Sequence, residues 1–69
     1  MKYISAKNIP LLKSGDLIKD MVLLSKQIEV FLRARKRNDF LWVSTYNPQS
    51  KSIENWSITK NENKRIVKI

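Results

Sequence analysis

The stretch SGDLIKDMVLLSKQIEVFLRARKR, residues 14–37, decides the fold that the sequence predicts. Its apolar side chains recur at intervals of four, three, four and three positions, at Leu17, Met21, Leu24, Ile28 and Phe31. This is the period of an amphipathic α-helix, and Ile18 and Leu32 widen the same apolar stripe. One long helix is therefore the expected element, and the other segments must pack against it.

Both ends of this stretch carry charges that suit a helix. Asp16 and Asp20 lie near its start, where the positive end of the helix dipole favours carboxylates, and Ser14 or Asp16 can cap it. Its last five positions hold four cations, Arg33, Arg35, Lys36 and Arg37. The negative end of the dipole favours cations there. The charges therefore agree with the apolar period, and we expect a helix over residues 14–37.

After Asn38 the apolar period changes from about 3.6 to 2, and aromatic and β-branched residues become frequent. This pattern predicts three antiparallel strands joined by short turns, at residues 40–46, 52–59 and 64–69. Pro48 and Asn63, in the two intervening segments, suit turn positions. Upstream of the helix, the sequence permits a short strand at residues 2–5 or a helical turn at residues 11–13.

The predicted fold class is therefore α+β, with one long amphipathic helix packed on a three-stranded antiparallel β-meander. The whole chain of 69 residues is expected to form a single small basic domain. It divides into an N-terminal segment, the helix and the meander, at residues 1–13, 14–37 and 40–69. A winged helix is the alternative, with a short helix over residues 5–14 and the wing over residues 40–59.

The register of the predicted strands decides which face of the sheet meets the helix. If Tyr46 lies opposite Ser52, Trp42 lies across from Trp56 and shares its face with Phe40. We expect this aromatic face to be the core, because two exposed tryptophans cost roughly 2–3 kcal/mol each. In the alternative the sheet turns over and presents a stacking platform for single-stranded nucleic acid, formed by Trp42, Tyr46 and Trp56 beside Arg65. A slip of one residue in either turn would regroup both faces.

The formal net charge is +8, from 14 Lys and Arg against 6 Asp and Glu. Such an excess favours polyanionic partners, and the cluster at the end of the predicted helix concentrates it. The residues expected to contact phosphates are Lys19, Lys26, Arg33, Arg35, Lys36, Arg37 and Arg65. The sequence therefore predicts a small accessory or regulatory protein that binds DNA or RNA.

A second class of function is suggested by two aliphatic residues that lie outside the apolar stripe of the predicted helix. Leu23 and Val30 lie seven positions apart, beside the basic ridge of the predicted helix. They are the expected partner contacts if the protein is a regulator or inhibitor that binds an acidic protein surface, as phages and mobile elements encode. Because Lys19 and Lys26 flank this ridge, like charges would limit self-association to a weak homodimer.

Catalysis has little support in this sequence. The chain has no Cys, no His and one Gly, which excludes thiolate nucleophiles, imidazole bases, the usual zinc sites and glycine-rich phosphate loops. The acidic residues of the second half, Asp39, Glu54 and Glu62, have no spacing typical of an acid–base pair or a metal-dependent nuclease. We predict a non-enzymatic protein with no cofactor, no catalytic residues and no metal site.

The predicted localisation rests on two features that the sequence lacks. No apolar run approaches the roughly 18 residues that cross a bilayer, and the start of the chain lacks the features of a secretory signal. We therefore expect a cytoplasmic protein with no membrane partner.

Overall fold

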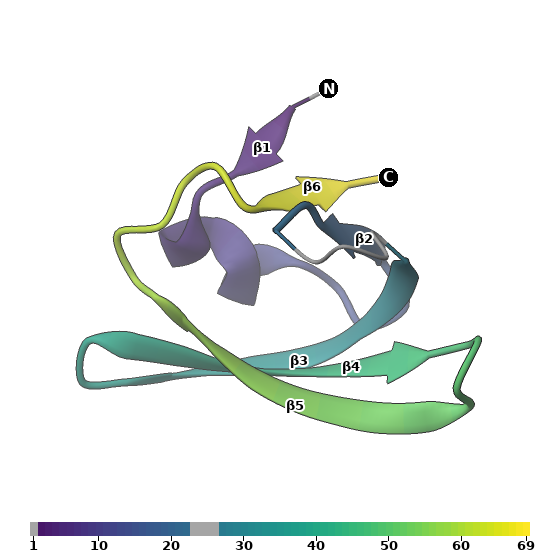
Figure 1. Cartoon of the computed structure of the whole chain (residues 1–69). Coiled ribbons are helices and arrows are strands. Elements are labelled where there is room, and N and C mark those ends of the chain that lie inside the picture. Colours follow the sequence, from purple (N-terminus) through teal and green to yellow (C-terminus); the bar gives the residue numbers. More distant parts are fainter. Residues whose placement is uncertain (1, 23–26) are drawn as a thin grey trace.

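The computed structural model describes residues 2–22 and 27–69, and within them the chain is almost entirely β-sheet (Figure 1). The elements are β1 (Tyr3–Ile4), the 3-10 helix η1 (Ala6–Leu11), β2 (Leu17–Asp20), β3 (Ile28–Arg37), β4 (Phe40–Asn47), β5 (Ser52–Thr59) and β6 (Ile66–Lys68). The predicted α+β fold is wrong. Because the described residues contain no α-helix, neither the long helix nor the winged-helix alternative is present.

Two strands, β2 and β3, occupy most of the segment that the sequence predicts to be helical. Glu29 and Phe31 of β3 are buried, a β-bulge between Phe31 and Arg33 then reverses the two faces of the strand, and Arg33, Arg35 and Arg37 are exposed. The apolar residues of this segment follow the helical period, whereas the β-bulge between Phe31 and Arg33 interrupts the alternation typical of a strand. Pairing with β4 supplies non-local hydrogen bonds and burial, which outweigh a weak local preference for helix.

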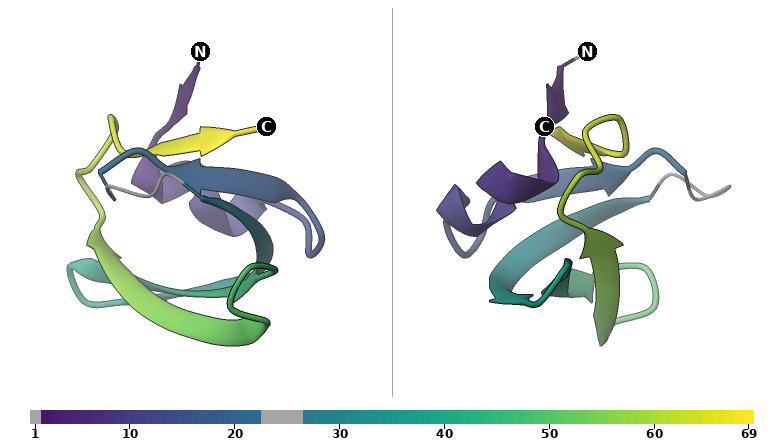
Figure 2. Two further views of the ribbon diagram at one scale, coloured as in Figure 1. Left: turned by 45° about the vertical axis from the view of Figure 1, so that its right-hand side comes forward. Right: turned by 90° about the vertical axis from the view of Figure 1, so that its left-hand side faces the viewer.

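The strands form one antiparallel sheet in the order β1-β6-β2-β3-β4-β5. The sheet curls so that β1, β6 and β2 lie over β3, β4 and β5 (Figure 1 and Figure 2). In the described sheet β6 pairs with β1 and β2 instead of β5. The predicted meander ending in residues 64–69 is therefore wrong, and the observed meander runs from β2 to β5.

Strands β4 and β5 cover the residues predicted for the first two strands, but their register differs by one residue. Tyr46 pairs with Ile53 instead of Ser52. Because adjacent side chains of a strand point to opposite faces, Trp42 and Trp56 no longer share a face. The predicted aromatic face is therefore divided between the two sides of the sheet.

Asn47 explains the changed register, because it extends β4 by one residue and organises the turn that follows. Its Oδ1 accepts a hydrogen bond from the backbone N–H of Gln49 at 2.9 Å. Its Nδ2 donates to Glu54 Oε2 at 3.0 Å and to Gln27 Oε1 at 2.8 Å. Lys51, with a φ of 55°, closes the turn in the left-handed region. These hydrogen bonds stabilise the turn and with it the observed pairing of β4 and β5.

The core lies between the two halves of the curled sheet. Its buried side chains are Ala6, Ile9, Ile18, Phe31, Leu41, Val43, Ile58 and Ile66. Trp56 is partly buried against this cluster, whereas Phe40 and Trp42 point to the opposite, outer face and are exposed. The expectation that Phe40, Trp42 and Trp56 together form the core is therefore wrong for the first two residues.

The N-terminal segment contributes one short strand and one helix. β1 pairs with β6, so the strand expected within residues 2–5 is confirmed. The helical turn expected at residues 11–13 is instead η1, which has Pro10 inside it and buries Ala6 and Ile9. In the part of the chain that the structure describes, no helix is long and apolar enough to cross a membrane.

Replacing Ile66 by Ala should destabilise the protein by about 2–5 kcal/mol, because a fully buried isoleucine loses its packing and leaves a cavity. Ile53→Ala is the matched control, since this side chain is 62% exposed on the outer face. Its cost should stay below about 0.5 kcal/mol. Urea unfolding followed by circular dichroism measures both values, and equal losses would contradict the described core.

Candidate nucleic-acid interface

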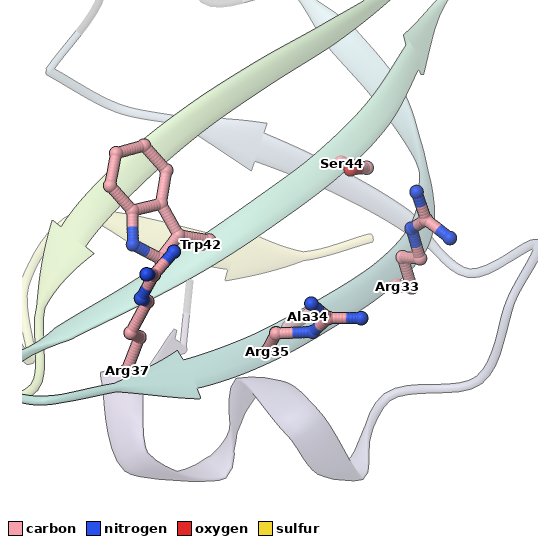
Figure 3. A pocket seen from close by; sticks show the side chains of 6 residues that line it. All are labelled: Arg33, Ala34, Arg35, Arg37, Trp42 and Ser44. Atoms are coloured by element: carbon pink, nitrogen blue, oxygen red, sulfur yellow. The ribbon is translucent and has the colours of Figure 1, made fainter.

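Three arginines follow one another along the outer face of β3. Since side chains two apart in a strand point the same way, Arg33, Arg35 and Arg37 project from one surface at intervals of about 6.6 Å. All three are exposed. Between them, Ala34 points inward and packs against the core. We call these three residues the arginine row (Figure 3).

The carboxylates of the chain are engaged away from the arginine row. The ion pairs of the described residues are Lys60–Asp39 at 3.4 Å, Arg65–Asp20 at 2.7 Å and Lys68–Asp16 at 3.9 Å. The remaining acids accept hydrogen bonds: Glu29 from Thr45, Glu54 from Asn47, and Glu62 from the backbone N–H groups of Asn63 and Lys64. Within the described residues, no carboxylate forms an ion pair with the arginine row.

Two exposed aromatic residues of β4 lie directly beside the arginine row. The register places Trp42 opposite Arg35 and Phe40 opposite Arg37. Trp42 is 48% exposed and Phe40 is 46% exposed. Figure 3 shows Trp42 rising from β4 next to the arginine side chains of β3. A large aromatic surface and three cations thus share one face of the sheet.

A hollow of about 310 Å³ lies on this face (Figure 3). Its lining residues are Arg33, Ala34, Arg35, Arg37, Trp42 and Ser44. Its size lies near the lower limit of small-molecule sites, which begin at about 300 Å³. The hollow is therefore large enough for a small ligand group, and guanidinium groups and an indole border it.

Polar side chains continue the same face towards β5. Ser44, opposite Arg33, donates a hydrogen bond to Asn55 Oδ1 at 2.7 Å. Because this bond engages the carbonyl oxygen of Asn55, the amide NH2 group is the part of that side chain that can donate to a ligand. Ser57 lies opposite Trp42. The face therefore offers mainly hydrogen-bond donors, which suits an anionic, acceptor-rich ligand.

The other predicted phosphate contacts are dispersed by the fold. Lys36 points away from the arginine row and lines a second hollow of about 260 Å³ with Lys7 and Lys60. Lys19, half-buried on β2, lies between Val67 and Ile28 on the neighbouring strands. Lys26 lies outside the described residues. The structure therefore brings together three of the seven predicted cations, all from β3.

Arg65 lies away from the arginine row and is held by contacts within the protein. Its guanidinium donates to both carboxylate oxygens of Asp20, at 2.7–3.0 Å, and lies 5.4 Å from the ring centre of Trp56. The hydrogen bonds to Asp20 are the main reason that the pKa of Arg65 is raised, although burial opposes them. The predicted platform of Trp42, Tyr46 and Trp56 beside Arg65 is therefore wrong. Trp42 and half-buried Tyr46 lie on the outer face, whereas Trp56 and the Arg65 guanidinium over it lie on the inner side.

The two predicted partner contacts do not form a helical ridge. Leu23 lies outside the described residues. Val30 is half-buried on β3 and pairs with Leu17 on one side and Tyr46 on the other. Its outward position is compatible with a contact, but the helical spacing from which the contact was predicted does not apply to Val30, which lies in a strand.

Three residues of this interface are not among the contacts that the sequence predicts. Phe40 was expected in the core, and Ser44 and Asn55 carried no signal of their own. The alternation of Arg33, Arg35 and Arg37 was the available clue, because a spacing of two aligns side chains in a strand and spreads them around a helix.

Behind the interface, a buried carboxylate connects β3 to β4. Glu29 is 5% exposed and accepts a hydrogen bond from Thr45 Oγ1, which accepts one from Trp56 Nε1 at 3.1 Å. Burial raises the pKa of Glu29, and the charges of Glu54 and Asp20 act in the same direction. The hydrogen bond from Thr45 partly opposes this shift.

Comparison with known proteins gives no match to a family model, to a curated protein or to a solved structure. The interface is therefore defined by its own residues and geometry.

Replacing Glu29 by Gln should raise the free energy of unfolding relative to wild type. This difference should grow as the pH is raised from about 4 to about 7. With a pKa raised above its ordinary value of 4.5, the native state holds a proton that the unfolded state has already released. Wild type therefore loses stability as the pH rises through this window, and the loss persists above it. Glutamine keeps an acceptor for Thr45 without the charge. Urea unfolding at several pH values measures the difference.

Asp39→Asn is the control, because the side chain of Asp39 is 82% exposed in the turn between β3 and β4. Its effect on the free energy of unfolding should be small, about 0.5 kcal/mol or less, because exposed charges contribute little to stability. A Glu29→Gln effect that is independent of pH would contradict the raised pKa.

Proposed function

We propose that this protein binds nucleic acid through the outer face of β3 and β4 and acts as a non-enzymatic accessory or regulatory protein. One observation carries the proposal. The arginine row has no carboxylate partner among the described residues, although six acidic side chains are available in the chain. Three cations on one face, spaced regularly and left for an external anion, favour a polymer of phosphates.

Arginine suits this role because its planar guanidinium binds phosphate oxygens through two parallel hydrogen bonds. Each phosphate that is neutralised also releases condensed counterions, which makes binding favourable at low salt. The net charge of +8 adds long-range attraction and speeds the encounter. The row thus supplies local contacts, and the remainder of the positive charge supplies steering.

Solubility alone explains this face poorly. Surface charges that serve solubility are ordinarily mixed in sign and interspersed. The outer face of β3 and β4 instead combines the arginine row with exposed Phe40 and Trp42 and carries no carboxylate among the paired positions. Exposed aromatic residues beside unpaired cations are typical of surfaces that bind a ligand.

A second candidate is binding to an acidic protein surface. The observation that favours it is an apolar line across four strands of the outer face, formed by Leu17, Val30, Tyr46 and Ile53. Leu17 is 41% exposed and Ile53 is 62% exposed. Apolar anchors next to cations also suit a protein partner. We prefer nucleic acid because three arginines have no carboxylate partner among the described residues, whereas only Leu17 and Ile53 of the apolar line are strongly exposed.

The variant Arg33→Gln, Arg35→Gln, Arg37→Gln should lose most of its affinity for oligonucleotides while remaining folded, since exposed charges contribute little to stability. If each arginine contacts one phosphate, the slope of log K against log salt should become shallower by about 2 to 3. Fluorescence anisotropy with labelled oligonucleotides over a series of salt concentrations measures both quantities.

The matched control is Lys2→Gln, Lys13→Gln, Lys64→Gln, which removes the same charge from exposed positions outside β3, β4 and β5. It should retain most of the affinity. Equal losses in the two variants would mean that net charge, and not this interface, determines binding. Wild type that binds no oligonucleotide at low salt would contradict the proposal and favour the acidic protein surface.

A further inference from the structure

We propose that the ligand of this face is single-stranded nucleic acid, with one base stacked on Trp42 and the backbone running along the arginine row. This inference rests on the proposed function and makes it more specific. It starts from the position of Trp42, which lies on the middle strand of three, between Arg35 on β3 and Ser57 on β5.

The exposed indole of Trp42 suits a ligand that has a free aromatic face. An indole that is 48% exposed on a small protein leaves apolar area in water, and no described element covers it. Bases within a duplex are stacked on each other, so their faces are hidden from a protein surface. An unpaired base offers its face to Trp42, and such stacking tolerates any base.

The shape of the sheet also disfavours a duplex groove. The major groove is about 12 Å wide and admits a helix or a ribbon of two strands. Here β4 is flanked by both β3 and β5, and adjacent strands are about 4.8 Å apart, so the backbone of this surface is already about 10 Å wide before its side chains are added. Trp42, at the centre of that surface, could not reach the bases of a closed groove.

The arrangement of charges suits an extended strand. From Arg33 to Arg37 the arginine row covers about 13 Å along β3. A backbone that follows this row carries its phosphates past successive guanidinium groups, while its bases turn towards β4. The hollow bordered by Trp42 and the arginines lies at the place where such a base would lie. Asn55, whose amide NH2 can donate, reaches the same face from β5 through its bond to Ser44.

The test compares an oligothymidine of about 12 nucleotides with a blunt duplex of the same length, both labelled, by fluorescence anisotropy. Wild type should bind the single strand at least about tenfold more tightly than the duplex. Trp42→Ala should weaken single-strand binding by about 5- to 150-fold. Trp42→Phe, which keeps an aromatic face, should retain most of the affinity, and it covers the case in which the alanine variant is unfolded.

Ile53→Ala is the matched control, because it removes an exposed apolar side chain from the same face but from another row of the sheet. Its affinity should be unchanged. Tryptophan emission adds a direct readout: oligothymidine should quench wild type, whereas Trp42→Phe, which retains only Trp56, should respond little.

The outcomes separate this inference from the proposed function. If the duplex binds as tightly as the single strand and Trp42→Ala has no effect, while loss of the arginine row weakens both, single-strand stacking is wrong and nucleic-acid binding stands. If wild type binds neither oligonucleotide, the proposed function is wrong and this inference falls with it.

Discussion

The antiparallel pairing of β3 with β4 is the interaction on which the rest of the structure depends. It is set by the two-residue turn between these strands, where Asn38 adopts a left-handed φ of 56° and Arg37 pairs with Phe40. Asn tolerates this conformation better than most residues, which makes the turn short and its register definite. Because side chains alternate across a sheet, this register decides at once which residues of both strands are core and which are surface. A shift of one residue would place the arginines on the same face of the sheet as Leu41 and Val43.

That division of faces gives polar groups two different roles. On the inner face they are paired: Glu29 accepts from Thr45, and Asp20 binds Arg65, which lies over Trp56. Within the described residues, no buried side-chain nitrogen or oxygen is without a hydrogen-bond partner. Burial of polar atoms without partners would cost too much for a domain this small. On the outer face the three arginines of β3 are exposed and form no ion pair with any described residue, so they contribute little to stability.

The helix predicted over residues 14–37 is wrong for an identifiable physical reason. The apolar residues recur there with the helical period, and a β-bulge between Phe31 and Arg33 interrupts the strand alternation, so the spacing of the three arginines was the local sign of a strand. The strands at residues 52–59 and 40–47 were predictable because aromatic and β-branched residues alternate clearly and turn residues bound them. Their register was not, since it depends on how Asn47 bonds to Gln49, Glu54 and Gln27 after the chain has folded. The arginine cluster could be found from the sequence, but its separation from Lys36 and Arg65 could not.

The sequence by itself determined the charge excess, the lack of Cys and His, the concentration of cations between residues 33 and 37, and two of the strands. These follow from composition and from neighbours along the chain, which need no knowledge of the fold. Only the tertiary structure decided that β3 is a strand, that Trp42 lies outside and Trp56 inside, and that three arginines share one face with Trp42. The physical reason is that strand pairing joins residues distant in sequence, and one residue of register exchanges the two faces of the sheet.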